Sequence, residues 1–274
     1  MAIKVERFVV SGGDLSLEPE ANFYLIESEG EAVLIDSGFY SEETKKLIEA
    51  IARKWNLKAA FITHLHEDHA GGIPFLRELG VKIFLHRDEK VPPSFKFEIE
   101  DAVFRVKEGL RLFFRGFTVR LCHTPGHTRG HISPYVEEEK ILFSGDTILS
   151  KGTPWVGPPE GDMKVYMETL KMLRGLDIRV IYSGHGEEIA NPGEKIDEYI
   201  AHRLEREKQI IKAIESGKKS IEEITDYVYD KEDLPEHVVP FARLTVLAHL
   251  DKLKKEGRVF QTSKTTYELL KGEK

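Results

Sequence analysis

The chain has 274 residues, of which 41% are hydrophobic, and a formal net charge of −7, values that suit a globular protein with one large domain and an appendage. No segment approaches the roughly 18 consecutive apolar residues of a membrane span, and the first residues lack the apolar core of a secretory leader. A single cysteine, Cys122, excludes an intramolecular disulfide. We therefore expect a cytoplasmic protein without a membrane partner.

Hydrophobic patterning predicts a mixture of strands and helices. Residues 22–36 contain two apolar runs around a charged turn, which is typical of a hairpin. Ser41 is expected to begin a helix that covers residues 44–54, and another helix is expected to include residues 74–79. Further strands are predicted over residues 59–62, 81–85, 104–106, 110–113, 117–122, 132–136, 141–143 and 180–182, and further helices over 163–174 and 192–216. These patterns alone indicate an α/β or α+β fold.

The residues after Glu215 have the pattern of a separate small module. Ser220 and Glu223 form a capping-box sequence before a predicted helix over 221–229. A second predicted helix runs from 239 to 256 and stops at Gly257, and residues 258–270 have a hairpin pattern. This order is similar to a winged helix. We therefore predict a catalytic domain over residues 1–215 and a winged-helix-like domain over 216–274.

The same module is locally basic. Residues 243–264 contain six Lys or Arg residues and two acidic residues, which leaves a local excess of four positive charges. Such an excess is expected of a module that contacts RNA. A solvated surface on a packing or dimerising module gives the same count, so a homodimer is the alternative.

A cluster of metal-binding side chains follows the apolar run at residues 59–62. Residues 63–69 read THLHEDH and place three imidazoles and two carboxylates within seven positions. Histidine nitrogen and carboxylate oxygen are common ligands of zinc. The cluster therefore predicts a metal site, whose remaining ligands should come from elsewhere in the chain.

Three further candidate ligands lie at the ends of other predicted strands. His127 lies in HTPGHTRGH, Asp146 in FSGDT and His185 in YSGHG. Ligands in α/β proteins gather where strands lead into loops at one edge of a sheet. We therefore expect these side chains to meet the residues of the THLHEDH segment.

The motifs HxHxDH, PGHT, SGDT and SGHG, in this order, resemble the metallo-beta-lactamase-fold hydrolase superfamily. This resemblance implies an αββα sandwich. Residues 181–210, together with the small C-terminal module, resemble the lactamase-beta-2-like branch, whose best-described function is endoribonuclease cleavage of single-stranded RNA.

Carried over by position, the resemblance implies two divalent metal ions. One would be held by His64, His66 and His127, and the other by Asp68, His69 and His185. Asp146 would bridge the two ions. Ligands restricted to nitrogen and oxygen suit Zn²⁺ and also Mn²⁺ or iron, with Zn²⁺ as the first expectation.

This ligand set suggests a hydrolytic mechanism. Two cations lower the pKa of a bridging water toward about 7 and thereby supply hydroxide at neutral pH. Asp68 is expected to be the catalytic residue, because it can orient this hydroxide and carry a proton to the leaving group. For His123 and His131 we expect hydrogen-bonding roles rather than ligation.

Two residues are candidates for substrate binding. Trp155 lies in a loop rich in proline and glycine after Asp146, where an aromatic ring can stack on a base, cover an acyl group or pack on the domain. His202 lies in the segment HRLERE, after His185, and can approach the same cleft.

Three functions are consistent with these observations. The first is a dinuclear hydrolase of phosphodiesters, with single-stranded RNA as the substrate. The second is a glyoxalase II-like or acyl thioester hydrolase, although the Lys and Tyr that grip glutathione in glyoxalase II have no clear counterpart here. The third is a regulatory or nucleic-acid-binding protein that retains its metals, an interpretation that a complete ligand set disfavours.

Overall fold

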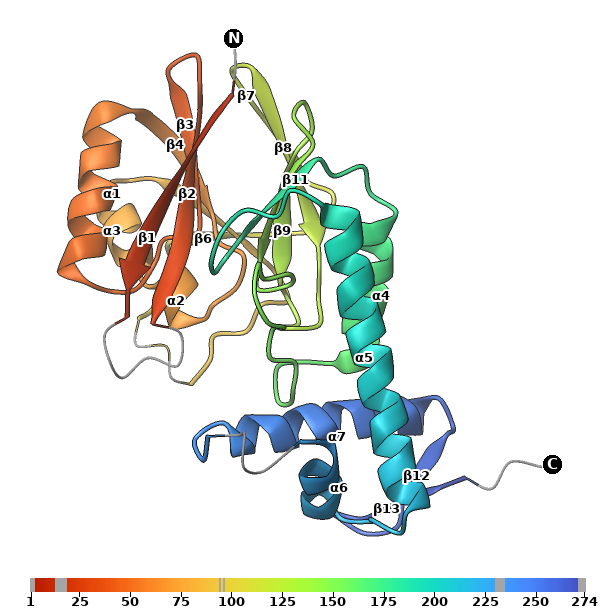
Figure 1. Ribbon diagram of the computed structural model, residues 1–274. Coiled ribbons are helices and arrows are strands. Elements are labelled where there is room, and N and C mark those ends of the chain that lie inside the picture. Colours follow the sequence, from red (N-terminus) through yellow and green to blue (C-terminus); the bar gives the residue numbers. More distant parts are fainter. Residues whose placement is uncertain (1–2, 13–18, 94, 96, 230–234, 271–274) are drawn as a thin grey trace. The chain divides into compact units, whose positions relative to one another are not determined.

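The computed structural model describes residues 3–12, 19–93, 95, 97–229 and 235–270 (Figure 1). Contacts divide the chain into two compact units. The first contains Met1–Thr124, Arg129–Pro154 and Leu176–Pro192, and the second contains Pro125–Thr128, Trp155–Gly175 and Gly193–Lys274.

The first unit is built on two sheets. One has the strand order β1-β2-β3-β4-β5-β6, with bounds Lys4–Ser11, Glu20–Ser28, Glu31–Ile35, Asn56–Phe61, Lys82–His86 and Val103–Val106. The other has the order β11-β10-β9-β8-β7, with bounds Val180–Ser183, Ile141–Gly145, Ile132–Val136, Phe117–His123 and Arg111–Phe114. Strands β3 to β6 pair in parallel, as do β10 and β11, whereas the other neighbours are antiparallel.

Alternate residues of the first sheet point into two different cores. Tyr24 and Ile26 of β2 pack with residues of β8, β9 and β10 between the two sheets. Phe23 and Leu25 pack on the opposite face, against helices α1 (Glu42–Lys54) and α3 (Ile73–Glu78), which cover that face in Figure 1. Because both faces are buried, these strands are hydrophobic along their length, in contrast to the alternating pattern of a half-exposed sheet.

The second unit contains four helices and a hairpin among the described residues. They are α4 (Met163–Arg174), α5 (Pro192–Glu215), α6 (Ile221–Val228), α7 (Val239–Lys255), β12 (Val259–Gln261) and β13 (Tyr267–Leu269). Ile210 and Ile214, near the end of α5, share a core with α6, α7 and the hairpin. The core of the C-terminal module therefore includes the end of α5, before residue 216, and the domain division at 215/216 stays a prediction.

Most predicted elements are present with bounds that differ by one to three residues. Ser41 accepts a hydrogen bond from the amide of Thr44 and caps α1, as expected. Strand β1 was not predicted, and it pairs along its whole length with β2 at the edge of the sheet. Among the described residues, no helix has the length and apolar character needed to cross a membrane.

The predicted capping box at the start of α6 is present. The Ser220 hydroxyl accepts from the amide of Glu223 at 3.1 Å, and the Glu223 carboxylate accepts from the amide of Ser220 at 3.0 Å. Two amides of the first turn are thereby satisfied.

Replacing Ser220 by Ala should destabilise the C-terminal module by about 1 kcal/mol, because one amide of α6 loses its acceptor. Hydrogen exchange of the α6 amides measures this change. Lys264→Ala, at an exposed position outside the helices, serves as the control. Equal protection of α6 in the Ser220→Ala variant and the unaltered protein would contradict the prediction.

Candidate metal centre

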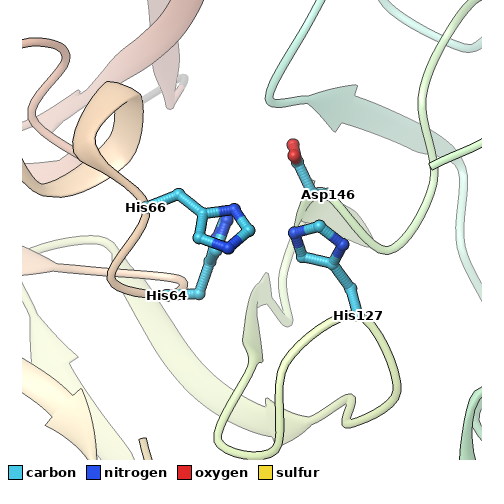
Figure 2. A group of neighbouring side chains, drawn as sticks. All are labelled: His64, His66, His127 and Asp146. Atoms are coloured by element: carbon cyan, nitrogen blue, oxygen red, sulfur yellow. The ribbon is translucent and has the colours of Figure 1, made fainter. Parts of the chain in front are cut away.

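Four of the predicted ligands form one group. His64, His66, His127 and Asp146 each offer a ligand atom, and these atoms all lie within 4.8 Å of one another (Figure 2). His64 and His66 follow β4, and Asp146 follows β10. Figure 2 shows the rings of His66 and His127 facing each other, with the His64 ring behind that of His66 and the Asp146 carboxylate above them. Such a set of nitrogen and oxygen donors suits a divalent cation.

The remaining predicted ligands form a second group. Asp68, His69 and His185 also offer atoms within 4.8 Å of one another. Asp68 and His69 lie on the short helix α2 (Glu67–Ala70), and His185 follows β11. One oxygen of Asp146 lies 3.2 Å from Nε2 of His69 and 3.3 Å from Nε2 of His185. Asp146 therefore contacts both groups, as a bridging ligand must.

Hydrogen bonds fix the orientation of three of these imidazoles. Nδ1 of His127 donates to the carbonyl of Trp155 at 2.7 Å, and Nδ1 of His185 donates to the carbonyl of Glu20 at 2.7 Å. Nδ1 of His69 donates to the carboxylate of Asp36 at 2.8 Å. Because each Nδ1 is engaged by a fixed acceptor, Nε2 is the nitrogen that faces the site, and a cation binds there by displacing any proton that the carboxylates hold on it.

The same logic applies to His64. The hydroxyl of Thr63 donates its proton to Asp36 at 2.9 Å, so it can only accept from Nδ1 of His64, which lies 3.1 Å away. Asp36 thus orients His69 directly and His64 through Thr63.

The carboxylates of the site create a negative electrostatic potential that favours positive charge nearby. Burial opposes the charged form of His185, but the nearby carboxylates of Asp146 and Asp68 outweigh it and raise the pKa of His185 to about 10. Burial likewise opposes ionisation of Asp146, yet the imidazoles of His69 and His185 hold its pKa well below the usual range.

The buried Nε2 atoms of His69 and His185 make no hydrogen bond with any described residue, although each faces carboxylate oxygens. Imidazole nitrogens left in this way, beside anionic oxygens, are the donors that a metal ion requires. The residues present therefore fit divalent cations. This chemistry does not distinguish Zn²⁺ from Mn²⁺ or iron.

Two carboxylates that support the site were not predicted. Asp36, at the end of β3, has a φ of 60° and also accepts from the amide of Thr63 at 2.7 Å. Glu89 accepts from the amide of Leu65 at 3.0 Å and from the amide of Gly130 at 2.9 Å. Glu89 therefore joins the loop that follows β4 to the loop that precedes β9. The Asp-Ser-Gly sequence after β3 was a signal for Asp36, whereas Glu89 has no local motif.

His131 and His123 lie outside both donor groups. Nε2 of His131 accepts from the amide of Asp146 at 3.2 Å, and its Nδ1 faces the hydroxyl of Thr124 at 2.9 Å. His123 stacks on His86 with ring centroids 4.0 Å apart. His131 thus hydrogen-bonds to the backbone of the predicted ligand Asp146, whereas His123 packs against His86, which is not a predicted ligand.

Trp155 and His202, the predicted substrate-binding residues, are also outside the donor groups. The ring of Trp155 contacts that of Phe241 edge-on, with centroids 5.7 Å apart. His202 is half-buried on α5, where burial and the neighbouring Arg203 and Arg206 lower its pKa. Their role in substrate binding stays a prediction.

Comparison with known families gives two matches. Residues 18–185 match the Metallo-beta-lactamase superfamily, and residues 220–266 match the Beta-lactamase associated winged helix domain. The chain belongs to the metallo-beta-lactamase superfamily. The predicted fold, with mixed sheets and a C-terminal winged helix, is confirmed.

Individual proteins of known name are also similar to this chain. A Beta-lactamase-like protein 2 homolog from Caenorhabditis elegans is 34% identical over 92% of this chain and 84% of its own length. An Atrochrysone carboxyl ACP thioesterase from Aspergillus fumigatus is 30% identical over 71% of this chain and 60% of its own length.

Among solved structures, a metallo-beta-lactamase family protein from Thermus thermophilus has a TM-score of 0.79 at 25% identity and covers 97% of this chain and 98% of its own. The family and these relatives indicate that the chain is a hydrolase, as predicted.

Replacing Asp36 by Asn should lower the affinity for divalent metal about 10- to 100-fold, because His69 loses the carboxylate that orients it. Competition with a chromophoric chelator measures this affinity. Asp101→Asn, at an exposed position, is the matched control. Unchanged affinity in a folded Asp36→Asn variant would show that this carboxylate does not support the site.

Gly184 leaves space that the site requires. A Cβ at this position would lie 2.5 Å from the His69 ring and 2.7 Å from the Asp146 carboxylate. Gly184→Ala should therefore reduce metal content to one ion per chain or less, as measured by elemental analysis. Gly175→Ala, where a Cβ has its nearest neighbour at 3.5 Å, should retain the full content. Full metal content in Gly184→Ala would be inconsistent with this geometry.

Proposed function

We propose that the chain is a two-metal hydrolase that cleaves phosphodiester bonds in single-stranded RNA. The observation that carries the two-metal part is the contact of Asp146 with both donor groups. The RNA part is supported by the similarity to the lactamase-beta-2-like branch, which extends through the C-terminal module to 92% of the chain.

In this proposal the side chains divide as the two donor groups suggest. His64, His66 and His127 would hold one ion, Asp68, His69 and His185 the other, and Asp146 both. We expect Zn²⁺, with Mn²⁺ or iron as alternatives. When bound, the ions supply a water with a pKa lowered to about 7 and Lewis-acid polarisation of the scissile group.

Asp68 is the proposed catalytic residue. Its carboxylate lies 3.2 Å from Nε2 of His185, and its side chain is 13% exposed, so it is close to the donors and still accessible to solvent. Nearby imidazoles hold the pKa of Asp68 below its usual range against the effect of burial. Asp68 is therefore ionised at neutral pH, as a group that orients water and accepts its proton must be.

The contact with RNA would use fewer basic residues than the sequence count implies. Lys252 pairs with Glu207 at 2.7 Å and with Glu256 at 2.9 Å, and Lys255 pairs with Asp162 at 2.6 Å. Of the six basic residues, Arg243 and Lys264 are exposed and have no ion pair among the described residues. We propose these two as phosphate contacts, because exposed unpaired cations supply the electrostatic part of RNA binding.

Hydrolysis of an acyl thioester is the second candidate. It is favoured by the similarity to a relative named as an acyl carrier protein thioesterase, of which the chain spans 60%. A regulatory protein without catalysis is a weaker candidate, because a pure binding function does not require two complete donor groups.

The candidates can be separated by two substrates. We expect metal-loaded protein to cleave a fluorophore-quencher oligoribonucleotide, to lose this activity with a chelator, and to leave S-lactoylglutathione intact. Asp68→Asn should reduce cleavage at least about 100-fold, the usual scale of a lost proton-transfer group. Asp101→Asn should not change the rate. Rapid thioester hydrolysis with intact oligoribonucleotide would reverse the proposal in favour of the second candidate.

A further inference from the structure

The loop that carries His127 is held by the segment 155–162 and by α4. Nδ1 of His127 donates to the carbonyl of Trp155 at 2.7 Å, and the carbonyl of Gly126 accepts from the amide of Asp162 at 2.9 Å. On the other side, the hydroxyl of Thr169 in α4 donates to the carbonyl of Pro125 at 2.6 Å. The first two of these hydrogen bonds join the loop to backbone atoms of Trp155 and Asp162. Their geometry therefore depends on the position of the backbone of the segment 155–162.

Helix α7 contacts this segment at Trp155. The ring of Phe241 meets the ring of Trp155 edge-on, at 5.7 Å and an interplanar angle of 88°. A Cβ on Gly157 would lie 3.0 Å from the Trp155 ring and 3.1 Å from Leu244 of α7, so this side of the helix leaves little free space around the indole. The Trp155 indole is therefore packed against α7, and the same residue supplies the carbonyl that accepts from His127.

The same helix contacts the segment again at Asp162. Nζ of Lys255, at the end of α7, lies 2.6 Å from one oxygen of Asp162. The other oxygen of Asp162 accepts from the amides of Lys164 and Val165 and caps α4. Lys255 therefore contacts the residue whose amide bonds to Gly126, directly beside His127.

From these contacts we infer that the C-terminal module positions His127 for metal binding, with Phe241 and Lys255 of α7 as the positioning residues. The inference rests on the proposed function, because it gives His127 the role of a metal ligand. Neither side chain touches the ion in this account. Phe241 acts through the Trp155 carbonyl, and Lys255 acts through Asp162 and the loop backbone.

The expected effect of these substitutions on metal affinity can be given a magnitude. Removing a group that orients a metal-binding histidine lowers metal affinity about 10- to 100-fold. Phe241→Ala leaves the Trp155 carbonyl in the chain and removes only the ring that fixes its place. An effect of this size would therefore show that the module contributes to the ligand geometry.

Metal binding without substrate tests the inference. Co²⁺ is titrated into the apoprotein, and its visible absorption reports both affinity and coordination geometry. For the unaltered chain we expect two ions. For Phe241→Ala we expect one ion to bind as before and the other to weaken at least tenfold, with an altered spectrum, as for His127→Ala. Lys255→Met should shift the same ion by a smaller factor.

Two further variants separate positioning from general loss of stability. Leu253→Ala removes a buried side chain of α7 that belongs to the core of the C-terminal module, so it weakens the module elsewhere. It should leave both Co²⁺ affinities unchanged. Phe241→Leu retains bulk beside Trp155 and should recover most of the lost affinity. If Phe241→Ala does not fold, Lys255→Met carries the test, and unchanged affinity for both ions in that variant would overturn the inference.

The outcomes distinguish this inference from the proposed function. If the unaltered chain binds no Co²⁺, the proposed function is wrong and the inference falls with it. If the unaltered chain binds two ions and folded Phe241→Ala binds both with the same affinity, only the inference is wrong. An equal loss in Leu253→Ala would also overturn the inference, because general destabilisation would then explain the effect.

Discussion

The site depends on the attraction between buried carboxylates and imidazoles at the ends of several strands. Asp36, Asp68 and Asp146 all lie within 3.4 Å of a nitrogen of His69, whose side chain is fully buried. Burying a charged group is costly unless that group is paired and hydrogen-bonded. Each of these groups is therefore stable in the protein interior only when the others are in place. The two hydrophobic cores of the first unit pack against the strands whose ends carry these residues.

Much of this arrangement is predictable because its signals are local. The THLHEDH segment and the glycine-flanked His127, Asp146 and His185 each follow a recognisable apolar run. The structure brings their donor atoms together in two groups. Helix starts at Ser41 and Ser220 were predictable for the same reason, since a cap and the amide that it satisfies are three residues apart.

The parts that could not be predicted depend on contacts between residues distant in sequence. Glu89 supports two loops that are 65 residues apart, Leu65 and Gly130, and no motif marks it. Strand β1 is only half-buried, so its hydrophobic pattern is a weak indication of a strand. Its structure depends on pairing with β2, which a local pattern does not reveal. The charge count of the C-terminal module was correct, but sequence could not show that Lys252 and Lys255 are neutralised by Glu207 and Asp162.

The donor groups are drawn from four separate stretches of the chain, and this has a consequence for the lifetime of the protein. Two ions that together bind all four stretches act as cross-links present only in the folded state, so they stabilise that state by mass action in proportion to the logarithm of their free concentration. Folded protein that lacks metal opens more often and is degraded sooner. Cellular metal supply would then set the abundance of this hydrolase as well as its activity.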